Sequence, residues 1–224
     1  YLSRRLTKAV RIMLSLREYC RRRLMVRQLN CTNEENLQNL NRNSATISSC
    51  RAFYRGEEVL MACKSIVGKR IDEPRVSRLY DQHVVNLLKV EDIRNNPCLL
   101  EFATHKELVA LISRYFGTVP ILADMQIWWA RPNDSGVIGA KQFHFDQEDY
   151  TTIRLFLYIN DVTSESGPLT YFDRNVSEQI KAAVPNWYVR ISDKMLDDLS
   201  FMDQVNYLTG ASGMIALVDP ARLC

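Results

Sequence analysis

The sequence predicts an α+β protein in which a layer of helices packs against a β-sandwich or barrel. Up to residue 117, apolar residues recur at spacings of three and four, as they do on one face of a helix. After Pro120, short runs of β-branched and aromatic residues alternate with turn-forming Gly, Pro, Asn and Asp. Helices followed by many short strands indicate this architecture. A chain of 224 residues, 46% of them hydrophobic, is long enough to bury a core without disulfides or a structural metal.

The first segment, residues 2–29, predicts one long helix. It carries nine Lys or Arg against the single acid Glu18, whereas the remaining residues carry 20 bases and 25 acids. Our interpretation is a helix packed on the body with a solvated basic face, and the alternative is a surface for nucleic acid, anionic lipid or an acidic partner. Nucleic acid is disfavoured, because aromatic residues do not alternate with the bases as single-strand binding requires. The apolar stripe consists of Leu2, Leu6, Ala9, Met13, Leu16 and Cys20.

The following segments predict a linker and then the helical layer. Residues 30–50 are rich in Asn, Ser and Thr and predict a polar linker, so we divide the chain into residues 1–50 and a body of residues 51–224. Helices are expected at about 56–67 and 76–90, and a third ends at Gly117, a typical C-terminal cap. The expected strands are 121–130, 141–146, 152–159, 168–172, 204–208 and 213–218, with short helices at 177–183 and 193–201.

The cysteines and the lengths of the apolar runs indicate in which cellular compartment the protein is expected. Six cysteines are widely scattered without a CxxC pair, which is typical of free thiols in a reducing environment. No apolar run approaches the roughly 18 residues that a membrane-spanning helix requires, and residues 1–29 lack the uninterrupted apolar stretch of a secretory signal. We therefore expect a soluble, cytoplasmic protein without a membrane span.

One of the three histidines stands in a pattern that carries chemistry. His83 and His105 lie among ordinary amphipathic neighbours, and we interpret both as surface or core residues. His144 and Asp146 lie two positions apart on an expected strand, so their side chains point to the same face. An imidazole beside a carboxylate supplies two of the three ligands of the 2-His-1-carboxylate triad that holds Fe(II) and leaves sites open. An ordinary His/Asp pair on a sheet is the alternative.

The context of this pair resembles a known family. The residues 144–150, the apolar run 153–162 that ends in Asp-Val, and the Gly-Pro-Leu turn at 167–169 together resemble the phytanoyl-CoA dioxygenase-like family. The likeness covers about residues 90–224. It implies a double-stranded β-helix (a jelly-roll, cupin-like core) and a non-haem iron dioxygenase with His144 and Asp146 as metal ligands and catalytic residues. The implied cofactor is Fe(II), with 2-oxoglutarate and O₂ as cosubstrates, and the implied reaction hydroxylates a C–H bond of a small or carrier-bound organic molecule.

The last segment, residues 210–224, resembles the strand that leads into the family's second iron histidine. The sequence contains no histidine after His144. We expect the chain to be a fragment that stops just before that histidine, because it also begins without Met. The alternative is a non-catalytic β-helix that serves as a binding or interaction module and lacks a complete iron site.

The candidate cosubstrate contacts come from the strands around the motif. Gln126 stands where the family often places a residue that contacts 2-oxoglutarate. Arg154 and Tyr158 share one strand face, and the Arg154 guanidinium is suited to bind a carboxylate of the cosubstrate or the substrate, although an arginine at the solvent end of a strand fits equally well. Thr170, after the Gly-Pro-Leu turn, is a further candidate contact. Two neighbouring tryptophans, Trp128 and Trp129, are expected in the core and the barrel wall, and loops 131–141 and 173–203 are expected to set the substrate.

Overall fold

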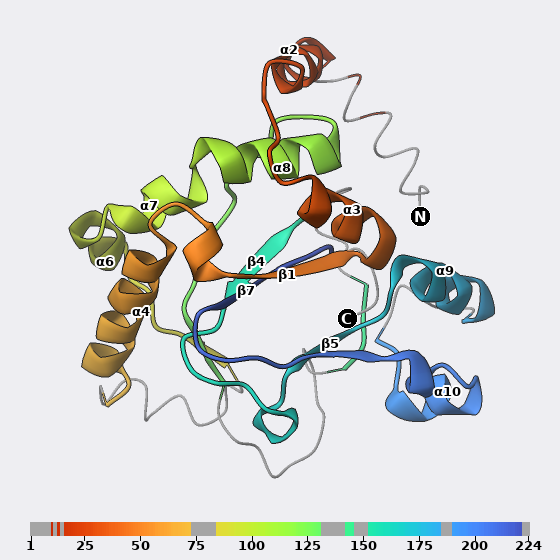
Figure 1. The fold of residues 1–224 in the computed structure, drawn as a ribbon. Coiled ribbons are helices and arrows are strands. Elements are labelled where there is room, and N and C mark those ends of the chain that lie inside the picture. The colour runs from red at the N-terminus through yellow and green to blue at the C-terminus, as the bar shows by residue number, and fades with distance from the viewer. Residues whose placement is uncertain are drawn as a thin grey trace.

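A three-stranded antiparallel sheet forms the centre of the molecule (Figure 1). The computed structural model describes residues 10, 13, 16–72, 84–130, 142–145, 152–184 and 190–220. The strands are β1 (Ala45–Ser49), β7 (Met214–Val218) and β4 (Arg154–Leu157), in the order β1-β7-β4. Val218 lies opposite both Ala45 and Arg154 in the register. The nearly all-apolar sequence of β7 matches its place as the middle strand, which is covered on both faces.

Helices cover one face of this sheet. Alternation along β4 and β7 directs Leu155, Leu157, Ile215 and Leu217 into a core shared with the helices. These helices are α3 (Glu34–Asn43), α4 (Gly56–Arg70), α6 (Val90–Asn95), α7 (Cys98–Ala103) and α8 (Lys106–Phe116). Gly117 ends α8 with φ 68°, a left-handed conformation that glycine adopts without strain, so the predicted cap is confirmed.

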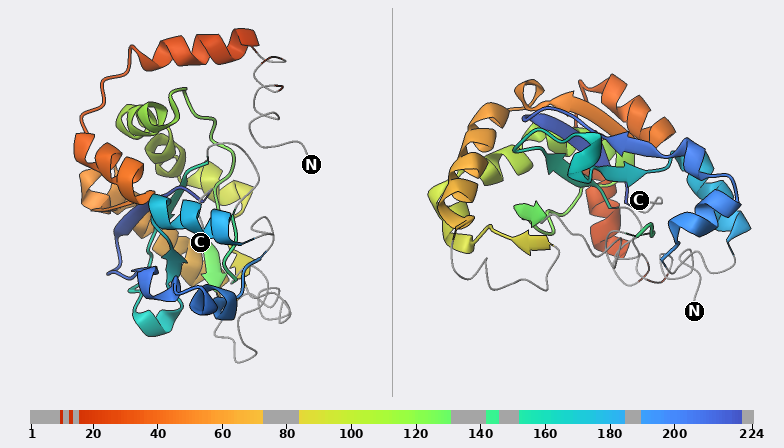
Figure 2. Two further views of the ribbon diagram at one scale, coloured as in Figure 1. Left: turned by 90° about the vertical axis from the view of Figure 1, so that its right-hand side faces the viewer. Right: turned by 90° about the horizontal axis from the view of Figure 1, so that it is seen from below.

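The opposite face of the sheet packs against a second, two-stranded sheet. β5 (Leu169–Tyr171) pairs with β6 (Asn206–Leu208), and Tyr171 and Leu208 join Phe156, Ala216 and Val218 in a small core between the two sheets. Outside this second sheet lie α9 (Arg174–Ala183) and α10 (Asp193–Asp198), so that the layers follow one another in an arch (Figure 2). Within the described residues the strands form small antiparallel sheets and do not close into a barrel. The short 3₁₀ turns are Cys50–Ala52, Ser164–Ser166 and Met202–Gln204.

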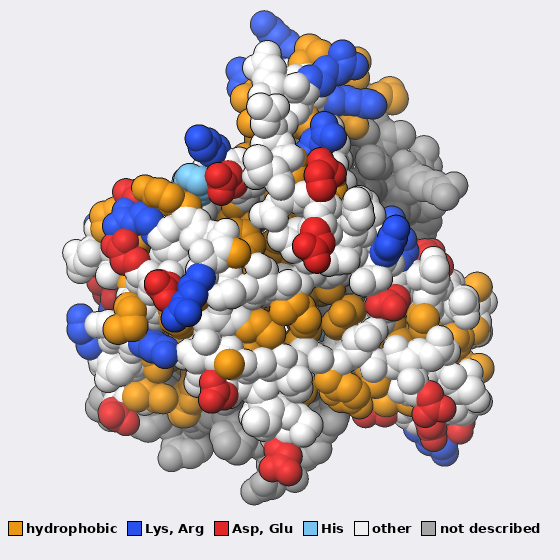
Figure 3. All heavy atoms as spheres, in the orientation of Figure 1, with side chains coloured by type: hydrophobic (Ala, Val, Ile, Leu, Met, Phe, Trp, Pro, Cys, Tyr) orange, Lys and Arg blue, Asp and Glu red, His pale blue; other side chains and the backbone are white. Residues whose placement is uncertain are grey.

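Helix α2 (Leu16–Val26) lies at the edge of the molecule (Figure 2). It contacts the body through the buried Val26 and through Arg22, whose Nε donates to the carbonyl of Val119 at 2.9 Å. The described residues of the apolar stripe that was expected to pack on the body face solvent instead: Met13 is 74% and Leu16 53% exposed. In the space-filling view, α2 at the top carries blue and orange side chains side by side (Figure 3). No helix of the described residues is both long enough and apolar enough to cross a membrane.

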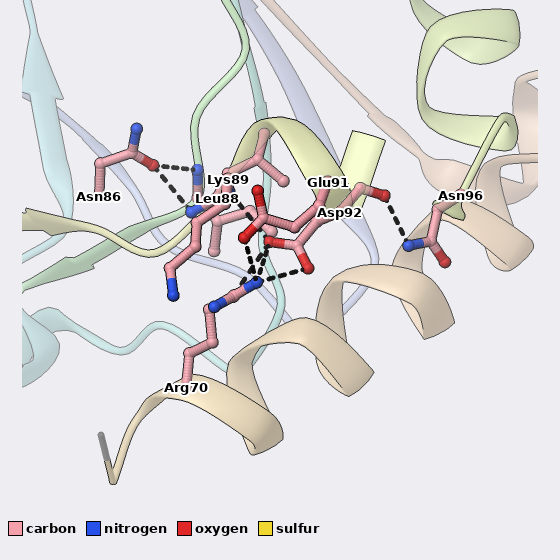
Figure 4. A network of polar contacts seen from close by, with 8 residues as sticks. Arg70, Asn86, Leu88, Lys89, Glu91, Asp92 and Asn96 are labelled. Carbon is pink, nitrogen blue, oxygen red and sulfur yellow. Dashed lines mark hydrogen bonds and ion pairs between the residues drawn. The ribbon is translucent and has the colours of Figure 1, made fainter. Parts of the chain in front are cut away.

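A polar network fastens a third, small sheet to the helical layer (Figure 4). This sheet pairs β2 (Val84–Asn86) with β3 (Trp128–Ala130). Asn86 Oδ1 accepts hydrogen bonds from the backbone N–H groups of Leu88 and Ile127, each at 3.1 Å. Arg70, at the end of α4, binds both carboxylate oxygens of Asp92 on α6, at 3.0 and 2.8 Å. These bonds, with one from the backbone of Lys89, hold the pKa of Asp92 below its usual range.

Residues 30–50 are not a linker, and the boundary at residue 50 falls inside the body. They form α3 and β1, and β1 pairs along its whole length with β7. The Asn-rich composition conceals an amphipathic helix, in which Leu40 is fully buried. Asn36 also has a structural partner, because its Oδ1 accepts the Thr46 hydroxyl at 2.6 Å.

Other predicted boundaries are confirmed or corrected by the structure. The expected helices near 56–67, 177–183 and 193–201 are present as α4, α9 and α10, and four of the six expected strands are present in shortened form as β4, β5, β6 and β7. The predicted helix 76–90 is wrong where it is described, because residues 84–86 form β2. In 121–130 only the last three residues pair as a strand, and in 141–146 the described residues make a single bridge, between Phe143 and Ile191.

Candidate functional site

His144 lies in a short extended segment between two buried phenylalanines. Phe143 is 6% and Phe145 3% exposed, and both belong to the core beneath α9 and α10. The ring centroid of Phe143 is 5.2 Å from that of Phe172, and Lys181 of α9 places its ammonium 4.7 Å from the centre of the Phe145 ring. Since extended chain alternates its side chains, His144 points to the side opposite this core, where it is half-buried.

A backbone hydrogen bond selects the tautomer that the neutral form of this imidazole adopts. Nδ1 of His144 lies 2.8 Å from the carbonyl oxygen of Gln142. A carbonyl oxygen can only accept, so Nδ1 carries the proton and the Nε2 atom of the neutral ring carries the lone pair. Histidines that bind metals through Nε2 commonly donate their other N–H to a backbone carbonyl in this way. The local geometry therefore fits a metal ligand.

The remainder of the expected metal motif lies partly outside the described residues. Asp146 and His83 both belong to ranges that the structure does not describe. Within the described ranges, no three His, Cys, Asp or Glu side chains gather closely enough to hold a metal ion. His105 stacks on the exposed ring of Tyr54, with centroids 4.2 Å apart, which agrees with its interpretation as a surface or core residue without a role as a ligand.

Arg154 and Tyr158 lie on the side of β4 that faces the second sheet. Their neighbour Phe156 packs between the two sheets, and the residues at alternate positions pack against the helices. Arg154 is half-buried and lies opposite Val218, at the end of the sheet where β7 finishes. A guanidinium there, on the inner face, is suited to bind a carboxylate.

Tyr158 has a structural partner. Its hydroxyl donates to the carbonyl of Leu208 at 2.5 Å, which ties the end of β4 to β6. Burial raises the pKa of this phenol, so the hydroxyl keeps its proton at neutral pH. Because its hydrogen is already donated to Leu208, the Tyr158 hydroxyl could contact a cosubstrate only by accepting a hydrogen bond.

Gln126 lies on the exposed face of the β3 segment. Its Nε2 donates to Asp124, and its Oε1 accepts the indole N–H of Trp128. Both ends of the amide are thus used in a surface chain on one side of the strand. Ile127 and Trp129 occupy the other side and pack into the helical core. The expectation of two enclosed tryptophans is correct for Trp129 and wrong for Trp128, which is 51% exposed.

Thr170 lies on the outer side of the second sheet. Its neighbours in β5, Leu169 and Tyr171, point into the core between the sheets, so the alternate position points away from it. Its partner across the strands is Tyr207, which is 56% exposed. The structure therefore separates Thr170 from the inner face on which Arg154 lies.

A buried polar cluster that the sequence did not predict surrounds the end of β7. Asp219 is 4% exposed, and its Oδ2 accepts the Tyr115 hydroxyl at 2.7 Å. The Tyr115 oxygen in turn accepts a hydrogen bond from Nη2 of Arg174 at 3.0 Å. The cluster joins α8, β7 and α9. One feature of the sequence could have indicated this cluster: Asp219 directly follows an apolar strand. An acid at the end of a buried strand is itself buried and therefore needs a hydrogen-bonding partner.

Contacts between side chains, together with adjacency along the chain, connect the His144 segment with this cluster. Phe143 touches Phe172, Phe172 stands two residues before Arg174, and Arg174 reaches Asp219 through Tyr115. Arg154 lies opposite Val218, the residue before Asp219. Elements that are distant in the sequence thus meet at one end of the two facing sheets.

The described cysteines offer no reactive thiolate in the core. Burial, with a smaller effect of Cys98, raises the pKa of the Cys63 thiol to about 11. Burial also raises the pKa of Cys98. Thiols of this kind stay protonated at neutral pH and are poor nucleophiles and metal ligands.

Comparison of the chain with protein-family models, with curated proteins and with solved structures finds no match.

Proposed function

We propose that the protein is an Fe(II)/2-oxoglutarate-dependent dioxygenase that hydroxylates a C–H bond of a small or carrier-bound organic substrate. The proposal includes a jelly-roll core, of which the facing sheets would be parts. The bound iron would supply the oxidative chemistry: one oxygen atom of O₂ enters the substrate, and the other enters the succinate formed from 2-oxoglutarate, with loss of CO₂. Succinate formation that depends on the substrate would thus report the reaction.

The observation that carries this proposal is the state of His144. Its Nδ1 proton is held by the Gln142 carbonyl, and its ring is directed away from the phenylalanine core. Asp146 follows two positions later, where continued extended chain would place its carboxylate beside the imidazole. His144 and Asp146 would hold the metal. The family resemblance implies a second histidine as the third ligand, and residues 1–224 contain no histidine after His144.

Other residues of the chain have roles that follow from their positions. Arg154 would pair with a carboxylate of 2-oxoglutarate or of the substrate, because it lies on the inner face at the end of β7. The apolar side chains beside it, Phe156, Ala216 and Val218, would keep water out and so strengthen that ion pair. The Asp219, Tyr115 and Arg174 cluster would hold the end of β7 in place.

The test uses the full-length protein, Fe(II), 2-oxoglutarate and O₂, and measures succinate. The expected result is succinate formation that His144→Ala abolishes. His105→Ala is the matched control, because that histidine stacks on the surface and should leave the activity unchanged. An iron-loaded, folded protein that forms no succinate with a broad panel of organic substrates would favour the non-catalytic binding module.

A further inference from the structure

Helix α2 presents an apolar stripe to solvent, flanked by arginines on both sides. The stripe consists of Leu16, Cys20 and Leu24, at successive spacings of four residues, which fall on one side of the helix. Leu16 is 53% and Leu24 57% exposed. The residues that hold α2 to the body, Arg22 and Val26, lie on the opposite side of the helix.

The flanking arginines lie on both edges of this stripe. At 3.6 residues per turn, Arg17 and Arg21 fall on one edge and Arg23 falls on the other, and Arg27 follows directly after the helix ends at Val26. All four are exposed. Arg21 also lies 3.3 Å from the carboxylate of Glu18, but both side chains are more than half exposed, so this contact leaves the guanidinium accessible.

We propose that α2 docks on the surface of an anionic lipid bilayer, with its apolar stripe between the acyl chains and its arginines at the phosphates. A helix of this composition lies parallel to a membrane when a basic polar face borders an apolar one. The long arginine side chains reach the phosphate level while their methylene groups stay in the apolar region. Since the helix stands at the edge of the molecule, it can meet a flat surface without moving the body (Figure 2).

The charge of the rest of the chain supports this orientation. Residues 30–224 carry 20 bases and 25 acids, so the body is repelled by the same surface that attracts the helix. A stripe-to-stripe pair with a second copy fits less well, because it would bring the arginines of the two helices together without opposite charges. A simple polyanion, such as nucleic acid, accounts for the arginines but leaves the exposed leucines without a role.

The experiment measures sedimentation of the protein with vesicles of phosphatidylcholine alone and of phosphatidylcholine with phosphatidylserine, over a series of salt concentrations. We expect binding only to the phosphatidylserine vesicles, weakening as salt rises. The triple change Arg17→Gln, Arg23→Gln and Arg27→Gln should reduce the partition coefficient about 100-fold, because each arginine contributes about fivefold. Leu16→Gln with Leu24→Gln should also abolish most binding, since the apolar insertion is lost. Glutamine has nearly the helix propensity of Leu and Arg, so α2 should remain helical.

Matched controls change exposed residues of the same kind on the body. Arg51→Gln with Arg94→Gln, and Met61→Gln, should leave vesicle binding unchanged. The proposal is overturned by equal binding to neutral vesicles, by no binding to anionic ones, or by controls that lose as much as the α2 variants. Leucine variants that bind like the wild type would also overturn it, since a polyanion site alone would explain that result. Dimerisation that the leucine variants remove, in the absence of vesicle binding, would assign the stripe to a second copy instead.

Discussion

The ion pair between Arg70 and Asp92 gives a sharp test of how the helical layer is held together. Both side chains are nearly buried, at 12% and 13% exposure, and two hydrogen bonds join them. Breaking a fully buried pair costs about 3–5 kcal/mol and breaking an exposed one about 0–1 kcal/mol. Because the pair lies between these two limits, we expect Asp92→Asn and Arg70→Gln each to lower the free energy of unfolding by about 2 kcal/mol. A double-mutant cycle should give a coupling of about 1.5 kcal/mol, because the two changes remove the same interaction.

The pH dependence of this pair has a definite sign. The folded-state pKa of Asp92 lies below its value in the unfolded chain. The contribution of the charged Asp92 to stability is therefore complete above the unfolded pKa, at about pH 4, and is lost as the pH falls through the folded pKa. The stability difference between wild type and Asp92→Asn should shrink when the pH is lowered from neutral through this range.

The assay is urea unfolding followed by far-ultraviolet circular dichroism. The matched control is Arg51 with Glu57, an ion pair whose side chains are 79% and 64% exposed, and its removal should change the unfolding free energy by at most about 0.5 kcal/mol. A coupling for Arg70 and Asp92 no larger than that of the control, or a stability difference that does not change with pH, would refute the reasoning.

Three further predictions concern other parts of the chain. Gly56→Ala should destabilise the protein by about 3 kcal/mol, because the added methyl would overlap the carbonyl of Cys50, whereas Gly68→Ala, with open space around it in the same helix, should stabilise it by about 0.5–1 kcal/mol; thermal unfolding compares the two. Tyr158→Phe should cost about 1–2 kcal/mol in urea unfolding, since the Leu208 carbonyl loses its partner, and a neutral result would mean that the bond does not hold the sheets together. In the native protein, iodoacetamide should label the exposed Cys20 rapidly and the buried Cys63 only after unfolding, as followed by mass spectrometry; equal rates would contradict the raised pKa of Cys63.

The parts of the fold that follow from local signals were predictable from the sequence. The end of α8 at Gly117, the positions of α4, α9 and α10, and the strand β7 all depend on periodicity or on a single cap residue. The linker prediction for 30–50 failed because asparagine usually marks loops, yet here Leu40 and the pairing of β1 with β7 supply the stabilising burial. That pairing joins residues far apart in the chain, so a pattern of neighbouring residues does not predict it.

The candidate site was predictable to a smaller extent. The alternation that places His144 between Phe143 and Phe145 is visible in the sequence, but the carbonyl that fixes its tautomer is visible only in the structure. The alternation of side chains along β4 and β5 also distinguishes the two candidate cosubstrate contacts. Arg154 lies on the inner face, between the sheets, and Thr170 lies on the outer face. The cluster of Asp219, Tyr115 and Arg174 joins residues 104 and 59 positions apart, so only the folded chain brings it together.

The most direct test of the proposed function is the binding of Fe(II) to the full-length protein, titrated without oxygen in the presence of 2-oxoglutarate. The charge-transfer absorption of the iron complex and the metal content after desalting report the occupancy. We expect one iron per chain in the wild type and in His105→Ala, and no stoichiometric binding in His144→Ala or Asp146→Ala. Iron binding by His144→Ala equal to that of the wild type would contradict the assignment of His144 as a ligand, and with it the proposed iron site.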